Sequence, residues 1–196
     1  MRVDEALLIQ AVDHGTSTLR FYTWDQPTIS LGYFQKDATD VPKALSHLPI
    51  VRRLSGGGAI LHHHELTYSI ALARTHPAAV KPLELYGRLH RAILRVLGTG
   101  GLDAELRGDA EADPSNRSFL CFARSDQHDI VVGVDKVVGS AQRRRKGAIL
   151  QHGSIVLKSS ELASFPGIID LGFDATVSIP ELAKSLESTF RGALIS

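Results

Sequence analysis

The chain has 196 residues, with 22 Lys and Arg against 21 Asp and Glu, a formal net charge of +1, and 43% apolar residues. This length suits one domain with a substantial core, and the composition is that of an ordinary globular protein. The near-neutral charge excludes a protein held on nucleic acid by bulk charge, and no apolar run approaches the roughly 20 residues that span a bilayer. We therefore expect a single domain over residues 1–196, with neither nucleic acid nor membrane as a partner.

The chain contains one cysteine, Cys121. A single cysteine cannot close an internal disulfide, which suits a reducing compartment. The first residues carry acidic side chains ahead of a very short apolar stretch, which is not the pattern of a signal peptide. We therefore expect a cytoplasmic protein. We also expect a monomer, because no amphipathic heptad or oddly apolar surface segment stands out.

The N-terminal part of the sequence predicts a helix followed by strands. Residues 1–12 have a mostly apolar face and predict the helix. Residues 18–24 and 28–33 are rich in β-branched and aromatic residues, and residues 25–27 (Asp-Gln-Pro) separate them, so they predict paired or neighbouring strands. Further strands are expected at residues 49–54 and about 59–72.

The C-terminal half predicts two amphipathic helices around an antiparallel meander. Apolar residues recur at helical spacing from Leu85 to Val96, which predicts a helix over about 83–97. Ser178 and Glu181 form a capping-box pattern with a proline in the first turn, which starts a last helix. Strands of the meander are expected at 129–134, 136–143 and 148–157. Strands interspersed with few helices indicate the α+β class rather than regular βαβ units.

A glycine-rich segment after the strand at 49–54 is the first candidate ligand site. It contains Ser55, Gly56, Gly57 and Gly58. Glycines permit positive φ and let a ligand approach backbone N–H groups, although the spacing fits neither a Walker motif nor a dinucleotide fingerprint. Arg52 and Arg53 alternate across the strand that feeds this loop, so one can point at a ligand and one away. A plain glycine turn with a solvated arginine pair is the alternative.

Three consecutive histidines follow, at positions 62 to 64. On a strand, His62 and His64 would share a face, a spacing that suits a metal. No cysteine or carboxylate cluster completes a ligand set, so we expect no metal site and assign His62 to substrate contact.

Cys121 and Lys136 are the candidate catalytic residues. Cys121 lies in an apolar stretch behind a polar segment at 107–117, which predicts a mobile loop. The thiolate is the nucleophilic form of cysteine, and a nearby ammonium such as that of Lys136 would stabilise it. A buried structural cysteine and an exposed strand lysine are the alternatives.

Lys136 opens a strand whose small residues would let a ligand lie against the backbone. The remaining candidates come from this strand and the next: Gly139, Ser140, Ala141, Gln142, His152 and Gly153. A structural histidine is the alternative for His152. The basic run at 143–146 indicates either a solvated turn or a docking patch for an acidic partner.

These motifs together resemble the lipoate–protein ligase and octanoyltransferase superfamily, which shares its catalytic fold with biotin protein ligase. The most specific are Arg-Arg-Leu-Ser-Gly-Gly-Gly at 52–58 and Lys-Val-Val-Gly-Ser-Ala-Gln at 136–142. Matching stretches also occur in family order at 4–8, 27–35, 59–62, 65–69, 121–122 and 151–155. The resemblance implies a mixed, largely antiparallel sheet flanked by helices.

A Cys-Phe pair followed by this lysine motif is similar to the cysteine-dependent octanoyltransferases. The resemblance implies that Cys121 accepts an octanoyl group from acyl carrier protein as a thioester and passes it to a lysine of a lipoyl domain or of the glycine-cleavage H protein. Lys136 would stabilise the thiolate and position the acyl carbonyl. Arg52, the three glycines and His62 would line the acyl pocket, with residues 139–142 as its other wall. This route needs neither ATP nor a metal.

Two alternatives stay open. An ATP-dependent lipoate–protein ligase would use the same fold and lysine, with the glycine loop serving the nucleotide and with ATP and Mg²⁺ as cofactors. Bacterial ligases usually carry an added C-terminal domain, for which 196 residues leave no room, so the transferase is favoured. A non-catalytic binder of acyl or lipoyl groups would keep the pocket without a reactive thiol. The chain departs from the family at His64, where an acidic residue is usual.

Overall fold

The computed structural model describes residues 1–35, 41–108 and 126–195. One set of strands consists of β1 (Thr18–Tyr22), β5 (Glu65–Leu72), β6 (Glu105–Leu106), β7 (Ile130–Val132), β8 (Asp135–Arg145) and β9 (Ala148–Val156). A second set consists of β2 (Thr28–Leu31), β3 (Ile50–Arg52) and β4 (Ile60–His62). The helices are α1 (Arg2–Asp13), α2 (Pro82–Thr99) and α3 (Ile179–Ile195), with the single-turn helices η2 (Lys43–Leu45) and η3 (Pro77–Ala79).

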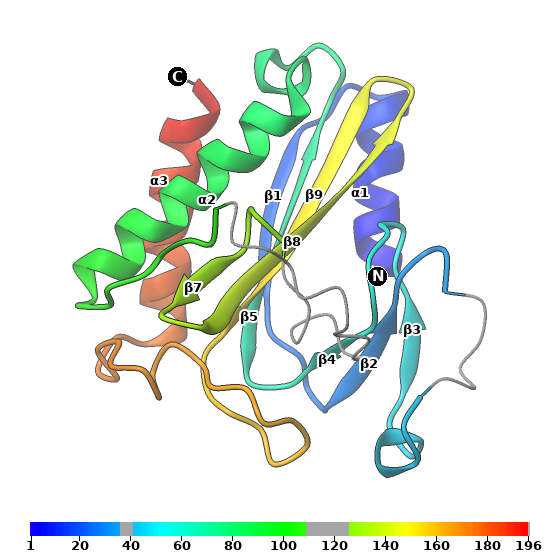
Figure 1. Cartoon of the computed structure of the whole chain (residues 1–196). Helices are drawn as coiled ribbons and strands as arrows, with labels where there is room; N and C mark the ends of the chain where they lie inside the picture. The colour runs from blue at the N-terminus through cyan, green and yellow to red at the C-terminus, as the bar shows by residue number, and fades with distance from the viewer. Residues whose placement is uncertain (36–40, 109–125, 196) are drawn as a thin grey trace.

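The first set forms a six-stranded sheet in the order β1-β5-β9-β8-β7-β6, and the second forms a smaller sheet in the order β3-β2-β4 (Figure 1). Every strand pair of the large sheet is antiparallel, whereas β2 and β3 of the small sheet are parallel. The expected α+β class, with a mixed and largely antiparallel sheet flanked by helices, is thus confirmed.

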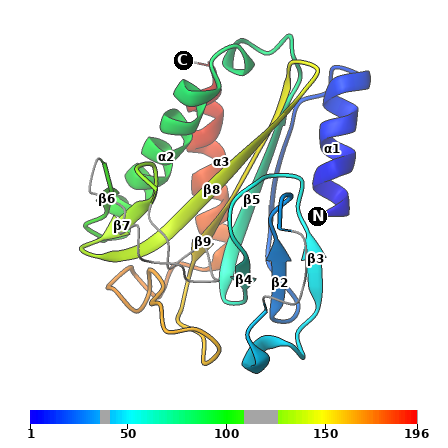
Figure 2. The same ribbon diagram turned by 45° about the vertical axis from the view of Figure 1, so that its right-hand side comes forward.

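Helices cover both faces of the large sheet (Figure 2): α2 and α3 lie on one face and α1 on the other. Side chains alternate across a strand, so β5 presents Leu66 and Ile70 to the core beneath α2 and α3. Ala71 lies on the opposite face, where it packs with Leu8 and Ala11 of α1. The face covered by α1 also holds the polar side chains of the candidate site, described below.

Two sequence expectations about strands are wrong. The strands at 18–24 and 28–33 are not neighbours, because β1 pairs with β5 while β2 pairs with β3 and β4. The Asp-Gln-Pro segment between them carries the chain from one sheet to the other instead of closing a hairpin. Likewise, residues 59–72 are two strands rather than one. The chain passes from the small sheet to the large sheet at His63 and His64, so β4 and β5 belong to different sheets.

Other local predictions are confirmed. The capping box forms, since the Ser178 backbone N–H donates to Glu181 Oε2 at 2.9 Å and the Glu181 N–H donates to Ser178 Oγ at 3.4 Å. The meander of β7, β8 and β9 forms as expected, and its second turn has positive φ at Lys146 (49°) and Gly147 (85°), as a tight hairpin requires. The short strand β6 was not predicted. No helix among the described residues has both the length and the hydrophobicity needed to cross a bilayer.

Candidate functional site

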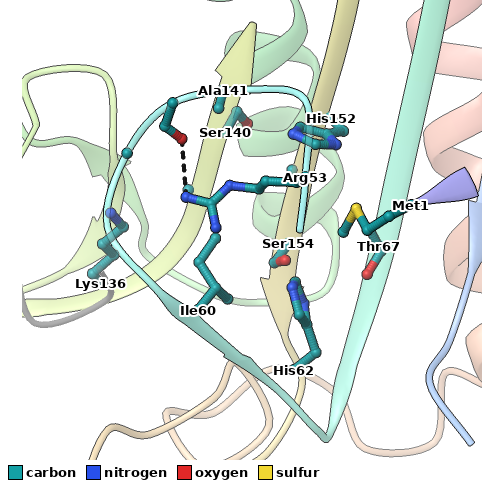
Figure 3. Close-up of a pocket in the computed structure, with 14 residues that line it drawn as sticks. Met1, Arg53, Ile60, His62, Thr67, Lys136, Ser140, Ala141, His152 and Ser154 are labelled. Atoms are coloured by element: carbon teal, nitrogen blue, oxygen red, sulfur yellow. Dashed lines mark hydrogen bonds between the residues drawn. The ribbon is translucent and has the colours of Figure 1, made fainter. Parts of the chain in front are cut away.

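A cavity of about 70 Å³ lies between the glycine-rich loop and strands β8 and β9 (Figure 3). The sequence-predicted residues that line it are Arg53, Gly56, Gly57, His62, Lys136, Gly139, Ser140, Ala141, His152 and Gly153. Lining residues that the sequence analysis missed are Met1, Ile60, Thr67 and Ser154. In Figure 3 Lys136 and Met1 stand at opposite sides of the cavity, with Arg53 and Ile60 between them. The site therefore combines cationic groups with an apolar lining.

Four predicted residues lie beside the cavity without lining it. Arg52 is exposed and donates from its guanidinium to the carbonyl of Gly32 at 3.2 Å. Gly58 and Ser55 are buried in the loop. The Gln142 side chain lies on the opposite face of β8, where it donates to the carbonyl of Pro82 in α2 at 2.8 Å. Cys121, the predicted nucleophile, lies outside the described residues.

Arg53 fixes the shape of the glycine-rich loop. Its guanidinium is buried and donates to the carbonyls of Gly56 at 2.9 Å and Gly58 at 2.5 Å, and to the carbonyl of Ser30 in β2 at 2.8 Å. One cation thus bridges both ends of the loop to the small sheet. The two arginines point opposite ways, as their alternation predicts, but the assignment of Arg52 to the pocket is wrong, because Arg53 lines the cavity and Arg52 is exposed.

The loop also requires a glycine in the chain segment that it contacts. A Cβ at Gly32, just after β2, would lie 2.0 Å from the Gly57 carbonyl oxygen, a distance that no side chain tolerates. Gly57 itself has φ of 92°, a conformation that favours glycine. The close backbone contact between Gly32 and Gly57 therefore depends on both residues having no side chain.

Lys136 reaches the cavity from β8 and forms a buried ion pair. Its Nζ lies 2.8 Å from Asp129 Oδ1, and the two side chains are 5% and 2% exposed. Burial raises the pKa of Asp129 above its ordinary value, although the Lys136 ammonium opposes that shift. A Cβ at Gly139 would lie 2.8 Å from Lys136 Cε, so the missing side chain at Gly139 makes room for the lysine. Asp129 was not predicted, because nothing in its sequence context marks it as a partner of Lys136.

His152 links the glycine-rich loop to α1. Its Nε2 lies 2.5 Å from Ser55 Oγ, and its Nδ1 lies 3.3 Å from Asp4 Oδ2. Burial lowers the pKa of His152, with Asp4 opposing. Burial alone would raise the pKa of Asp4, but His152, the N-terminal ammonium and the Ser69 hydroxyl together lower it below its ordinary value. The contacts from Ser55 to His152 to Asp4 resemble a Ser-His-Asp catalytic triad. Ser55 is 1% exposed and does not line the cavity, so these contacts anchor the glycine-rich loop.

His62 is held by partners on both ring nitrogens. Nδ1 lies 2.7 Å from Glu65 Oε1 and Nε2 lies 2.7 Å from Ser30 Oγ, while the ring stacks on Trp24 at 4.1 Å between centroids. Glu65 Oε1 also accepts from Thr67 Oγ1 at 2.5 Å and from Ser154 Oγ at 2.9 Å. One buried carboxylate thus positions three lining residues. Glu65 falls in the family-matching stretch at 65–69, and that match is the signal that could have identified it.

A polar cluster lies behind the β8 wall, on the face covered by α2. Ser140 Oγ contacts Tyr68 Oη and His90 Nε2, each at 2.6 Å. Burial raises the pKa of Tyr68 to about 12, so its hydroxyl stays protonated. A Cβ at Gly153 would lie 2.4 Å from Ser140 Oγ, so glycine is required where β9 crosses this cluster. The cluster ties the cavity wall to α2.

His90 gives this cluster a pH dependence. Burial lowers the pKa of His90 to about 4, whereas an unfolded histidine has a pKa of about 6.5. Between those values the unfolded chain binds a proton that the folded protein does not, so stability falls as pH drops from about 6.5 to about 4.

We expect His90 to contribute a loss of roughly 3 kcal/mol in the free energy of unfolding over that range. Denaturant unfolding of wild type and His90→Gln at both ends of the range measures it. Equal pH slopes in the two proteins would contradict the assignment, because His152 contributes equally to both.

A family model described as the lipoyl protein ligase A/B catalytic domain matches residues 1–190. Among curated relatives, octanoyltransferase LipM of Carboxydothermus hydrogenoformans is 42% identical over 163 residues, which cover 81% of this chain and 60% of that enzyme. LipM of Clostridioides difficile is 37% identical over 163 residues, which cover 80% of this chain and 60% of that enzyme. The matched region thus spans less than two thirds of the length of these relatives.

Solved structures agree with the fold. A Thermoplasma acidophilum protein, described as a candidate lipoate protein ligase and solved with bound lipoic acid, has a TM-score of 0.74 at 25% identity, covering 98% of this chain and 78% of that one. Lipoate-protein ligase A bound with ATP has a TM-score of 0.71 at 24% identity over the same shares, a likeness of fold alone. The fold expected from the resemblance is confirmed. With the glycine-rich loop, the buried lysine and the cavity between them in place, this chain belongs to the lipoyl protein ligase A/B catalytic-domain family.

Proposed function

We propose that the protein is an octanoyltransferase of protein lipoylation. It takes an octanoyl group from acyl carrier protein onto Cys121 as a thioester and passes it to a lysine of a lipoyl domain or of the glycine-cleavage H protein. The observation that carries the proposal is the 42% identity, over 81% of the chain, to a relative named octanoyltransferase. The reaction needs neither ATP nor a metal ion.

The transfer takes two balanced steps. The Cys121 thiolate attacks the carbonyl carbon of the carrier-bound octanoyl thioester, the carbon–sulfur bond to the carrier breaks, and the carrier leaves as a thiolate that takes a proton from water. The neutral amine of the acceptor lysine then attacks the Cys121 thioester, the carbon–sulfur bond to Cys121 breaks, and the proton lost by the nitrogen passes to the departing cysteine sulfur as the amide forms. The first step exchanges one thioester for another and the second forms a more stable amide, so neither step requires an external energy source.

The cavity supports this chemistry. The Lys136 ammonium lies in the cavity wall beside the backbone of β8. There it is suited to stabilise the negative charge that develops on the acyl oxygen. Ile60, Ala141 and Met1 supply apolar contact for an acyl chain. Arg53 holds the glycine loop that closes the other wall. We assign Lys136 to charge stabilisation and the loop to acyl binding.

Intact-protein mass spectrometry tests the proposal. Wild type and Cys121→Ala are mixed with octanoyl-acyl carrier protein without ATP, and the mass of each protein is measured before and after hydroxylamine. We expect one octanoyl adduct on wild type, removed by hydroxylamine, and no adduct on the variant. Because the chain has one cysteine, an adduct that depends on residue 121 assigns the thioester directly. An identical adduct on Cys121→Ala would reject this nucleophile.

A lipoate–protein ligase is the second candidate, favoured by the structural match to the T. acidophilum protein with bound lipoic acid. The same assay separates the two. Absence of an adduct without ATP, together with acylation of a lipoyl domain when ATP, Mg²⁺ and free lipoic or octanoic acid are supplied, would reject the transferase in favour of the ligase. Binding of the acid without acylation in either assay would leave a non-catalytic binding module.

A further inference from the structure

His63, His64 and Glu161 come together outside the acyl cavity. The two histidines join β4 to β5, and Glu161 follows β9. One ligand atom from each residue lies within 4.8 Å of the others, and the imidazole rings of His63 and His64 stack at 3.6 Å between centroids. Sequence analysis found no carboxylate to complete a metal-ligand set with these histidines, because Glu161 is distant along the chain.

We propose that His63, His64 and Glu161 bind one divalent transition-metal ion of the zinc class. Two imidazoles and one carboxylate are ligands that such ions accept, and three protein ligands leave a fourth position for water. Bound ligand atoms lie about 2.0 to 2.2 Å from zinc, and each imidazole lone pair lies in its ring plane, so the stacked rings must rotate apart as the three groups close on one ion. His64 and Glu161 are exposed and His63 is half-buried, so these side chains can rotate without disturbing the core.

The backbone around the cluster is already fixed. Ser160 Oγ lies 2.8 Å from His63 Nδ1, which leaves Nε2 as the nitrogen offered to the metal. The His63 carbonyl accepts from the Glu65 N–H at 2.9 Å, and the His64 carbonyl accepts from the Leu157 N–H at 2.8 Å. The histidines and the segment after β9 are thus held side by side before any ion binds.

The proposed metal site is separate from the acyl cavity. None of its three residues lines that cavity, although His62 and Glu65 flank the two histidines in sequence and hold the cavity wall. Lys158 borders the cluster and opposes a cation, so we expect moderate rather than tight affinity. Metal binding should therefore stabilise the β4–β5 connection without filling the acyl site. The inference does not depend on the proposed function.

Metal titration of the whole protein, without a polyhistidine tag, tests the site. Co²⁺ absorption reports ligand geometry, and thermal unfolding with Zn²⁺ reports binding to the folded state. We expect one ion per wild-type chain and roughly tenfold or greater weakening in both His64→Ala and Glu161→Gln. The control is His47→Ala, which removes an exposed histidine outside the cluster and should bind like wild type. No saturable binding to wild type, or equal binding to His64→Ala, would overturn the proposal.

Discussion

Replacing Lys136 by methionine is expected to destabilise the protein by about 3 to 5 kcal/mol and to abolish acyl transfer. The variant leaves the Asp129 carboxylate without the ammonium that lies 2.8 Å away, and both groups are almost completely buried. A buried charge that loses its partner costs far more than a hydrophobic replacement of the pair. Urea unfolding measures the stability change. Transfer of the octanoyl group from octanoyl-acyl carrier protein to a lipoyl domain measures activity.

The double variant Lys136→Met with Asp129→Asn separates the two roles. Removing both charges should restore most of the lost stability, because the core no longer holds a carboxylate that has lost its ammonium. The Arg107 guanidinium, whose Nε lies 4.0 Å from Asp129 Oδ2, loses its carboxylate in this variant, but its side chain is 18% exposed. Transfer should stay absent, because the ammonium at the cavity is still missing. A double variant that regains activity along with stability would show that Lys136 acts through the fold and not on the acyl group.

Replacing Arg53 by methionine is expected to cost roughly 3 kcal/mol or more, the second large effect on stability. The change removes the donor to the carbonyls of Gly56, Gly58 and Ser30, and buried carbonyls that lose a charged donor are costly. The glycine loop should lose its shape with it, so acyl transfer should fall even at temperatures where the variant is folded. Urea unfolding and transfer kinetics are the measurements.

Arg52→Met is the matched control, since the two arginines are adjacent in the sequence. Arg52 is exposed, and its guanidinium donates to the carbonyls of Gly32 and Gln35. We expect a change of about 1 kcal/mol or less. A similar loss from both variants would mean that the buried contacts of Arg53 do not decide the loop geometry.

Features set by neighbouring residues were predictable from the sequence. The capping box of Ser178, the helix at Leu85 and the β7–β8–β9 meander each follow from patterns a few residues long. The glycine-rich loop and Lys136 could also be proposed as parts of one site, because the family resemblance joins segments that are distant in the chain. The resemblance supplied what local patterns could not.

Partners that approach from distant segments were not predictable. Asp129, Asp4 and Glu65 each hold a cavity residue in place. Asp4 and Glu65 fall in stretches that match the family, but no local pattern shows which residue each of the three will contact. Alternation along a strand tells which side chains share a face but not which strands will pair. For this reason β1 and β2 were expected together, although they belong to different sheets.

The pairing of β5 with β9 has a consequence for synthesis of the protein. Glu65 pairs with Val156 and Leu72 with Ile149, so the centre of the large sheet joins an early strand to a late one. The cavity follows the same division, with Arg53 and His62 on early segments and Lys136 and His152 on late ones. Such distant pairing must overcome loop-closure entropy before it gains contacts, which slows folding. The walls of the cavity therefore cannot come together in a nascent chain until β9 has left the ribosome.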